Sequence, residues 1–269
     1  MAEHNDAKKI IKETADYQRT IAEHKRTIAE QERTIAEQER TIAEQERTIA
    51  QHKERIDIEK KKVIEISEVV EQTSMLLSRV MELRDPYTKG HSEHVGEIAV
   101  NFVTLNPLLN FPKEKIPVIY RAALLHDIGK IGISEQVLNK PTKLTEAELV
   151  MIKYHTNLGY NLIKPFLFDK LVGDAILYHH ENFDGSGYPE GLKGDEIPLI
   201  ARIFRIADYY DALTSSRPYR PALEPEVALR IMKGDSRCFD PNLFSFFVES
   251  IEHITKKASV PSEVPNARN

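Results

Sequence analysis

Isoleucine recurs every seven positions along the first part of the chain. Residues 20–54 repeat the sequence TIAEQER with small variations, and we assign the isoleucine of each repeat to the a position of a heptad. The repeats contain mostly alanine, glutamate, glutamine and arginine, which favour helices, and no proline or glycine precedes Pro86. The sequence therefore predicts one long N-terminal helix. Its predicted a positions are Ile21, Ile28, Ile35, Ile42, Ile49 and Ile56.

Two interpretations of this helix remain open. Isoleucine at a favours pairing of helices, so the first interpretation is a parallel two-stranded coiled coil that holds two copies of the chain side by side. The d positions are polar, which weakens such a seam, so the second is a solvated single helix. The strict seven-residue period favours the coiled coil. His24 and His52 replace glutamine at equivalent repeat positions, so we interpret them as seam or surface residues and not as metal ligands.

From about residue 84 to residue 257, apolar residues recur at helical spacing between short loops. Few segments show the alternation that is typical of strands, so the fold class is predicted to be all-α. We expect a coiled-coil stalk over residues 1–62, a globular domain over residues 63–257, and a disordered tail over residues 258–269, which is polar and contains proline.

Composition narrows the function classes. The chain has 269 residues, a net charge of −5 and one cysteine, Cys238, so it cannot form an internal disulfide. No apolar run approaches the length of a membrane span, and the first residues lack the apolar core of a signal peptide. We therefore expect a cytoplasmic protein that does not act in a membrane. A mildly acidic chain is also a poor candidate for binding long nucleic acids.

Histidine and aspartate residues stand on or at the ends of the predicted apolar helical faces. Leu149, Ile152 and His155 are spaced three apart, for example, so they share one face of a helix. A single such histidine is usually a core residue, but a set of buried imidazoles and carboxylates is costly without a compensating cation. Such ligands suit divalent metals such as iron and manganese. The set that predicts a metal cluster is His91, His126, Asp127, His155, His179, His180 and Asp208.

Residues 84–221 closely resemble the HD-GYP subgroup of the HD phosphohydrolases. The resemblance rests on the segments RDPYTKGHSEHV, AALLHDIGKIGI, YHHENFDGSGYPEGL and IADYYDALTSSRPYR, together with His155 between the second and the third. It implies an all-α HD-type helical bundle after the coiled-coil helix. It also implies a metal-dependent phosphodiesterase that hydrolyses cyclic di-GMP to the linear dinucleotide pGpG and, as a further expectation, on to GMP.

The resemblance also implies roles for single residues. His91, His126, Asp127 and Asp208 match the basic HD metal set, and His155, His179 and His180 match ligands of an additional metal, with Asp127 as the bridge. Lys130 resembles the lysine that contacts the scissile phosphate, and we expect Asp127 and Lys130 to be catalytic. Residues at substrate-facing positions are Asp211, Arg217 and Arg220.

Two features of the resemblance leave alternatives open. Members with three metals have a glutamate where this chain has Tyr87, so two divalent ions, iron or manganese, are favoured over three. Two such ions can activate a shared water, and the resulting hydroxide would attack phosphorus. In the loop DGSGYPEG, residues 184–191, Tyr188 either stacks on a guanine of the substrate or holds His179 and His180 from outside.

The sequence leaves two other functions open. One alternative is a catalytically weak module that binds a cyclic dinucleotide or a protein. Another is a phosphodiesterase for a different cyclic dinucleotide. The expected partners are cyclic di-GMP, a second copy of the chain through a parallel N-terminal coiled coil, and a diguanylate cyclase domain at the DGSGYPEG loop.

Overall fold

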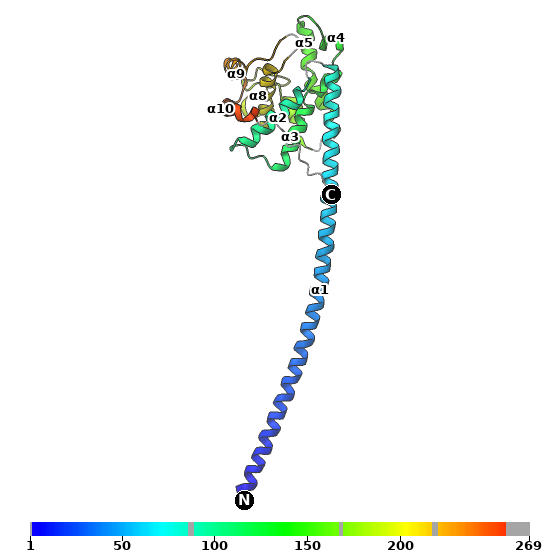
Figure 1. Ribbon diagram of the computed structural model, residues 1–269, viewed down its shortest axis with the longest axis vertical. Coiled ribbons are helices and arrows are strands. Elements are labelled where there is room, and N and C mark those ends of the chain that lie inside the picture. The colour runs from blue at the N-terminus through cyan, green and yellow to red at the C-terminus, as the bar shows by residue number, and fades with distance from the viewer. Residues whose placement is uncertain (1, 86–88, 167–168, 217–219, 257–269) are drawn as a thin grey trace. The chain divides into compact units, whose positions relative to one another are not determined.

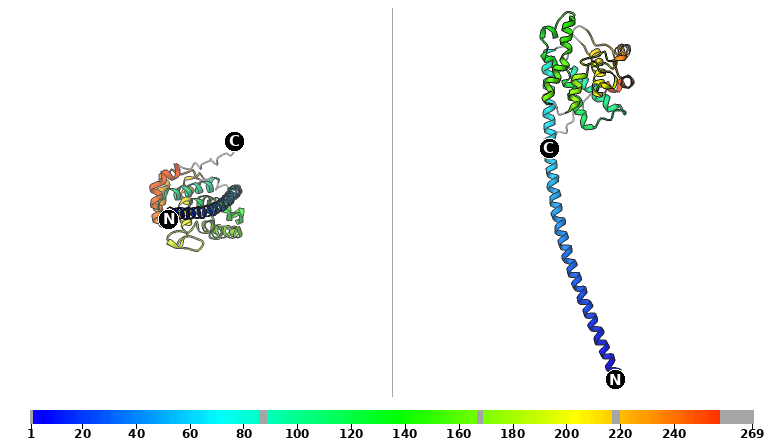
Figure 2. Two further views of the ribbon diagram at one scale, coloured as in Figure 1. Left: turned by 90° about the horizontal axis from the view of Figure 1, so that it is seen from below. Right: turned by 180° about the vertical axis from the view of Figure 1, so that it is seen from behind.

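The computed structural model describes residues 2–85, 89–166, 169–216 and 220–256, with side chains from residue 12 onward. Within these ranges the chain contains helices and turns but no strand, as the ribbons of Figures 1 and 2 show. The predicted all-α fold is therefore confirmed. The longer helices are α1 Ala2–Arg84, α2 His91–Leu105, α3 Ile116–Leu125, α5 Glu146–Lys153, α6 His155–Ile163, α7 Lys170–Tyr178, α8 Leu199–Thr214, α9 Pro225–Gly234 and α10 Pro241–Lys256. Shorter turns are η2 Lys113–Lys115, η3 Ile128–Gly132, α4 Glu135–Leu138, η4 Lys164–Phe166, η5 Gly194–Glu196 and η6 Ser236–Cys238.

Helix α1 is continuous over 83 residues, which confirms the predicted long N-terminal helix. The threonine of each repeat donates a hydrogen bond to the carbonyl four residues earlier, as Thr34 does to Glu30 at 3.1 Å. The a-position isoleucines are about half exposed in the single chain, between 52% for Ile56 and 55% for Ile49. Pairing of two such helices stays a prediction.

The chain divides into two compact units, residues 1–68 and 69–269. The boundary lies six residues beyond the predicted end of the stalk at residue 62, and no helix break marks it because α1 runs on to Arg84. The second unit therefore includes the last turns of α1. The predicted tail, residues 258–269, lies outside the described residues.

The core of the second unit is built mainly from α2, α3, α8 and α10. Helix α2 packs against the other three, and α7 packs against α3, α6 and α8. Phe102 of α2, Phe204 of α8 and Phe247 of α10 are almost fully buried. Removing such aromatic side chains from water is the main favourable contribution to folding. This core fixes the helices whose ends carry the predicted metal ligands.

Gly129 determines how closely η3 approaches α6. A Cβ atom at Gly129 would lie 1.8 Å from the carbonyl oxygen of His155 and 2.4 Å from the backbone nitrogen of Gly159. Only glycine permits this approach, which brings the segment that contains Asp127 against the first turn of α6. Among the described residues, no helix has the length and apolar character needed to cross a membrane.

Candidate metal centre

Helix ends supply most of the predicted metal ligands. His91 opens α2, His155 opens α6, and His179 directly follows α7. His126 follows α3, and Asp127 precedes η3. Asp208, in contrast, lies within α8 on its buried face. Chain direction changes at these ends, which lets residues far apart in the sequence meet at one place.

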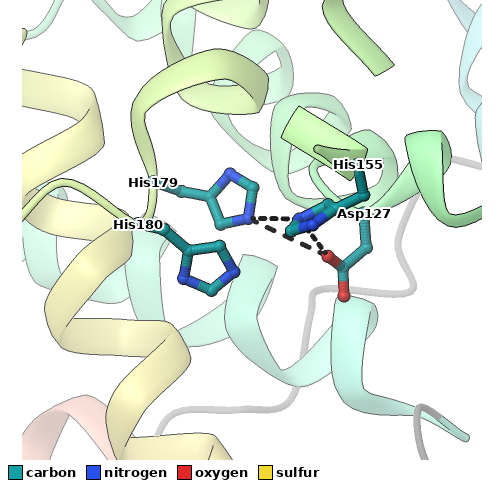
Figure 3. Close-up of side chains that lie close together, drawn as sticks. All are labelled: Asp127, His155, His179 and His180. Carbon is teal, nitrogen blue, oxygen red and sulfur yellow. Dashed lines mark hydrogen bonds and ion pairs between the residues drawn. The ribbon is translucent and has the colours of Figure 1, made fainter. Parts of the chain in front are cut away.

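The ligands form two groups that share Asp127. The potential ligand atoms of Asp127, His155, His179 and His180 lie within 4.8 Å of one another, and Figure 3 shows these four side chains converging. Those of His91, His126 and Asp127 satisfy the same distance limit.

Asp208 contacts one histidine of each group. One of its carboxylate oxygens is 3.1 Å from His91 Nε2, and the other is 3.9 Å from His180 Nδ1. The structure therefore brings together all seven side chains that the sequence predicts as metal ligands.

Three histidines are oriented with one ring nitrogen on a carbonyl and the other toward the cluster. The Nδ1 atoms of His126, His155 and His179 lie 2.6, 2.8 and 3.0 Å from the carbonyl oxygens three residues earlier. An Nδ1–H group that donates to a carbonyl leaves Nε2 as an acceptor with a lone pair. This is the arrangement that fixes the tautomer of metal-binding histidines.

The Nε2 atoms of these histidines need a positive partner. His126 Nε2 is buried and forms no hydrogen bond with the described residues. His155 Nε2 and His179 Nε2 lie 3.3 Å apart, so two lone pairs face each other when both Nδ1 atoms carry the proton. Divalent cations would satisfy these nitrogens, one at the group that contains His126 and one at the group that contains His155 and His179, so the residues present fit metal ions.

Electrostatics keep most of these imidazoles neutral. Burial lowers the pKa of His126, lowers that of His180 further, and lowers that of His179 to about 3. Burial also acts to lower the pKa of His91, but its hydrogen bonds to Asp208 and Asp211 outweigh this effect and raise the pKa to about 10. Neutral imidazoles are the form that binds metals.

Lys130 lies beside the shared carboxylate. Its Nζ atom is 2.7 Å from Asp127 Oδ2 and 3.3 Å from Asp85 Oδ2. Burial opposes its charge, but the charges of Asp127 and Asp85 outweigh burial and raise the pKa of Lys130. Lys130 is consequently a protonated donor at the edge of the ligand cluster, with 17% of its side chain exposed.

The DGSGYPEG loop packs against the segment that follows α7. Glu181 is 1% exposed, and its carboxylate accepts hydrogen bonds from the backbone N–H groups of Glu190, Gly191 and Leu192. A Cβ atom at Gly187 would lie 2.2 Å from the backbone nitrogen of Asn182, which explains the need for glycine there. The ring of Tyr188 lies 4.8 Å from that of His180 and is tilted by 31° to it. The loop therefore supports His180 from outside.

The sequence profile of the HD domain family matches residues 45–243. This chain belongs to the HD domain family. This chain is 40% identical over 190 residues to the cyclic di-GMP phosphodiesterase response regulator RpfG of Xanthomonas campestris pv. campestris. The matched region covers 68% of this chain and 50% of that protein. It is 39% identical over 168 residues to the 3'3'-cGAMP-specific phosphodiesterase 3 of Vibrio cholerae serotype O1. That match covers 62% of this chain and 36% of that protein.

A solved structure of a related protein is also similar. Bd1817, an HDG"Y"P protein from Bdellovibrio bacteriovorus, is 19% identical and has a TM-score of 0.49, with 60% of this chain and 51% of that chain covered. The family profile and the phosphodiesterase relatives confirm the predicted membership of the HD phosphohydrolases, and phosphohydrolases of the HD domain family depend on metal ions. The chain spans about half the length of the curated relatives it matches.

Residues predicted to face the substrate occupy different environments in this HD domain. Asp211 lies on the other side of His91 from Asp208, with its Oδ2 atom 2.6 Å from His91 Nδ1. Burial raises the pKa of Asp211, but its hydrogen bonds to His91 and His94 outweigh burial and lower the pKa to about 2. Arg220 donates to the backbone carbonyls of Ala212 and Leu213 at the end of α8. Arg217 lies outside the described residues, as does Tyr87.

Sequence reasoning missed three residues of the HD domain site. Asp85 contacts Lys130, and Glu181 holds the DGSGYPEG loop. His94 has an exposed side chain and is not in the predicted ligand set, and its Nδ1 atom lies 3.3 Å from Asp211 Oδ1. Asp85 and Glu181 could have been noticed as charged residues directly beside predicted ligand segments, but their partners could not.

Proposed function

We propose that this chain is a metal-dependent phosphodiesterase that hydrolyses cyclic di-GMP to pGpG, and then pGpG to GMP. The observation that carries the proposal is the pair of ligand groups that share Asp127 beside a protonated lysine. The names of two relatives, RpfG of X. campestris and PA4108 of Pseudomonas aeruginosa, support cyclic di-GMP as the substrate.

Two divalent ions, iron or manganese, would be held by the seven ligands. His91, His126, Asp127 and Asp208 would serve one ion, and His155, His179 and His180 would serve the other together with Asp127. When bound, such ions lower the pKa of a water molecule and neutralise charge that develops on the phosphate.

The side chains around the ligands would bind and orient the dinucleotide. Lys130 Nζ carries protons and is partly exposed, so it can donate to a non-bridging phosphate oxygen and stabilise the charge that grows there. Tyr188 is available to stack on a base beside His180. Asp127 keeps Lys130 turned toward the phosphate.

A double variant tests the proposed function. His126→Ala with Asp127→Ala should abolish production of pGpG and reduce bound metal in protein that is purified and assayed without oxygen. His253→Ala is a matched control, because His253 is exposed on α10 and should leave both readouts unchanged. Cleavage of cyclic di-GMP by the double variant at the rate of the wild type would refute the assignment of the site.

The hybrid dinucleotide 3'3'-cGAMP is a second candidate substrate. It is favoured by the 39% identity to a Vibrio cholerae phosphodiesterase that is named as specific for it. Rates measured with both dinucleotides under the same metal loading distinguish the two substrates, since the true substrate should show the higher kcat/KM.

The half-exposed isoleucines of α1 support a parallel homodimer as the functional form. Replacing Ile28 and Ile42 by aspartate would place charge in the seam and should yield monomers in sedimentation velocity. Arg26→Asp, which changes an outward-facing f position of the heptad directly before Ile28, is the control. Equal oligomeric states for all three proteins would contradict the dimer.

A further inference from the structure

Lys130 is held by two carboxylates, and only one of them belongs to the metal-ligand groups. Asp127 is the residue that both groups share, so its negative charge also serves the cations that bind there. Asp85 is 4% exposed and lies 3.3 Å from Lys130 Nζ. Its carboxylate is absent from both ligand groups in the described part of the chain. Asp85 can therefore hold Lys130 whether or not metal occupies the site.

Asp85 is fixed in position by the end of α1. It directly follows Arg84, the last residue of the helix, and its backbone N–H donates to the carbonyl of Met81 at 2.8 Å. This bond extends the helical hydrogen-bond pattern of α1 by one residue and fixes the backbone that carries the carboxylate. A side chain on a rigid element holds a partner more accurately than one on a loop does.

Neighbouring contacts tie the same helix end to both sides of Lys130. Met81 packs with Ile128 on one side of the lysine. Arg84 Nη2 donates to the carbonyl of Ile133 on the other side at 2.7 Å. The carbonyl of Arg84 in turn accepts from Asn139 Nδ2 at 3.0 Å. The segment from Ile128 to Ile133 is consequently bound to the last turn of α1 at both of its ends.

We propose that Asp85 is a positioning residue that anchors Lys130 and makes the C-terminal end of α1 a support of the active site. The catalytic part of this inference rests on the proposed function of the site. The contact between Asp85 and Lys130 does not, and it can be tested without substrate.

A double-mutant cycle tests the catalytic part. Asp85→Asn in the wild type should lower kcat about tenfold to hundredfold, the loss expected when a reacting group is misplaced by about 1 Å. Bound metal should be unchanged. In the Lys130→Met background, Asp85→Asn should cause no further loss, because Asp85 acts through the lysine. An equal fold-loss in both backgrounds would overturn the proposal.

Two further variants sharpen the comparison. Asp85→Glu keeps the charge and should recover part of the kcat that Asp85→Asn loses. Asp195→Asn is the matched control for exchanging carboxylate for amide, because the Asp195 side chain is 92% exposed and pairs only with Arg202 among the described residues. Its kcat should equal that of the wild type.

Urea unfolding of the metal-free proteins gives a readout that needs no activity. Asp85→Asn should lower the midpoint of the second unit in the wild type, because it leaves the buried lysine with one carboxylate fewer. The same change should lower the midpoint less in Lys130→Met. Equal shifts in both backgrounds would show that the two side chains do not interact. If the wild type cleaves no cyclic dinucleotide, the proposed function fails, while this unfolding cycle still decides whether Asp85 anchors Lys130.

Discussion

Gly129→Ala is expected to damage the metal centre without touching any ligand side chain. The new Cβ atom would lie 1.8 Å from the carbonyl oxygen of His155, whereas ordinary contacts of this kind begin near 3.4 Å. The difference, 3.4 − 1.8 = 1.6 Å, is the distance by which η3 and α6 must separate along this line. The obstacles are backbone atoms of His155 and Gly159, so no side-chain rotation can relieve the clash.

The expected loss of stability and metal affinity in Gly129→Ala follows from the position of His155. Its Nε2 atom is 3.2 Å from Asp127 Oδ1, and Asp127 stands two residues before Gly129. Separating η3 from α6 therefore pulls two ligands of one group apart. Overpacking of this kind costs about 1–3 kcal/mol in stability. Disturbing the support of ligands typically lowers metal affinity about 10–100-fold.

Titration of the metal-free protein with manganese, together with thermal unfolding, measures both effects. Gly129→Ala should bind manganese at least about tenfold more weakly. It should also unfold about 2–4 °C lower for each kcal/mol lost. Gly234→Ala is the matched control, because a Cβ atom at Gly234 would meet nothing within 4 Å. If Gly129→Ala matches this control in both measurements, the close crossing of η3 and α6 does not support the metal centre.

Three further outcomes are expected. Burial lowers the pKa of His179 from 6.5 to about 3 on folding, so the unfolded chain binds a proton more readily and the folded protein loses stability as the pH falls below 6.5. His91 acts in the opposite direction, so the test is comparative: the drop in urea midpoint of metal-free protein between pH 7.5 and pH 5 should be smaller in His179→Gln than in the wild type. Arg220→Ala should lower the unfolding temperature and leave KM unchanged, since its guanidinium bonds backbone carbonyls; a raised KM at constant unfolding temperature would instead support the predicted substrate contact. Glu181→Ala removes the acceptor of three backbone N–H groups, so trypsin should cleave faster after Lys193, and an unchanged rate would contradict that role.

The helices and the inward direction of the ligands could be predicted from the sequence. Each ligand is part of an apolar series at helical spacing, such as Leu149, Ile152 and His155, and burial of the series carries the ligand inward with it. The heptads of α1 likewise predict a helix without any tertiary contact. The spacing of apolar residues was sufficient to predict the direction of a side chain wherever burial of one helix face determines that direction.

Pairings between distant residues could not be predicted in the same way. Asp208 and Asp211 lie three positions apart in α8, so they share a face, and the sequence does not show which nitrogen of His91 each one approaches. The resemblance suggested substrate for Asp211, whereas its carboxylate contacts His91 and His94. No proline or glycine interrupts α1 between the two units, so the sequence contains no break that would mark a boundary between them.

Asp127 links the two ligand groups, so we expect the site to behave as one centre and not as two. Its carboxylate belongs to both ligand groups, and the Oδ2 atom that lies 3.5 Å from His126 Nε2 also accepts from Lys130 at 2.7 Å. A change at this carboxylate therefore alters both groups and the lysine at once, whereas a change at His91 or His180 directly alters only the group to which that histidine belongs. Asp85 gives Lys130 a second anchor outside this shared point. Lys130 therefore has one carboxylate partner that belongs to neither ligand group, so its position does not depend on Asp127 alone.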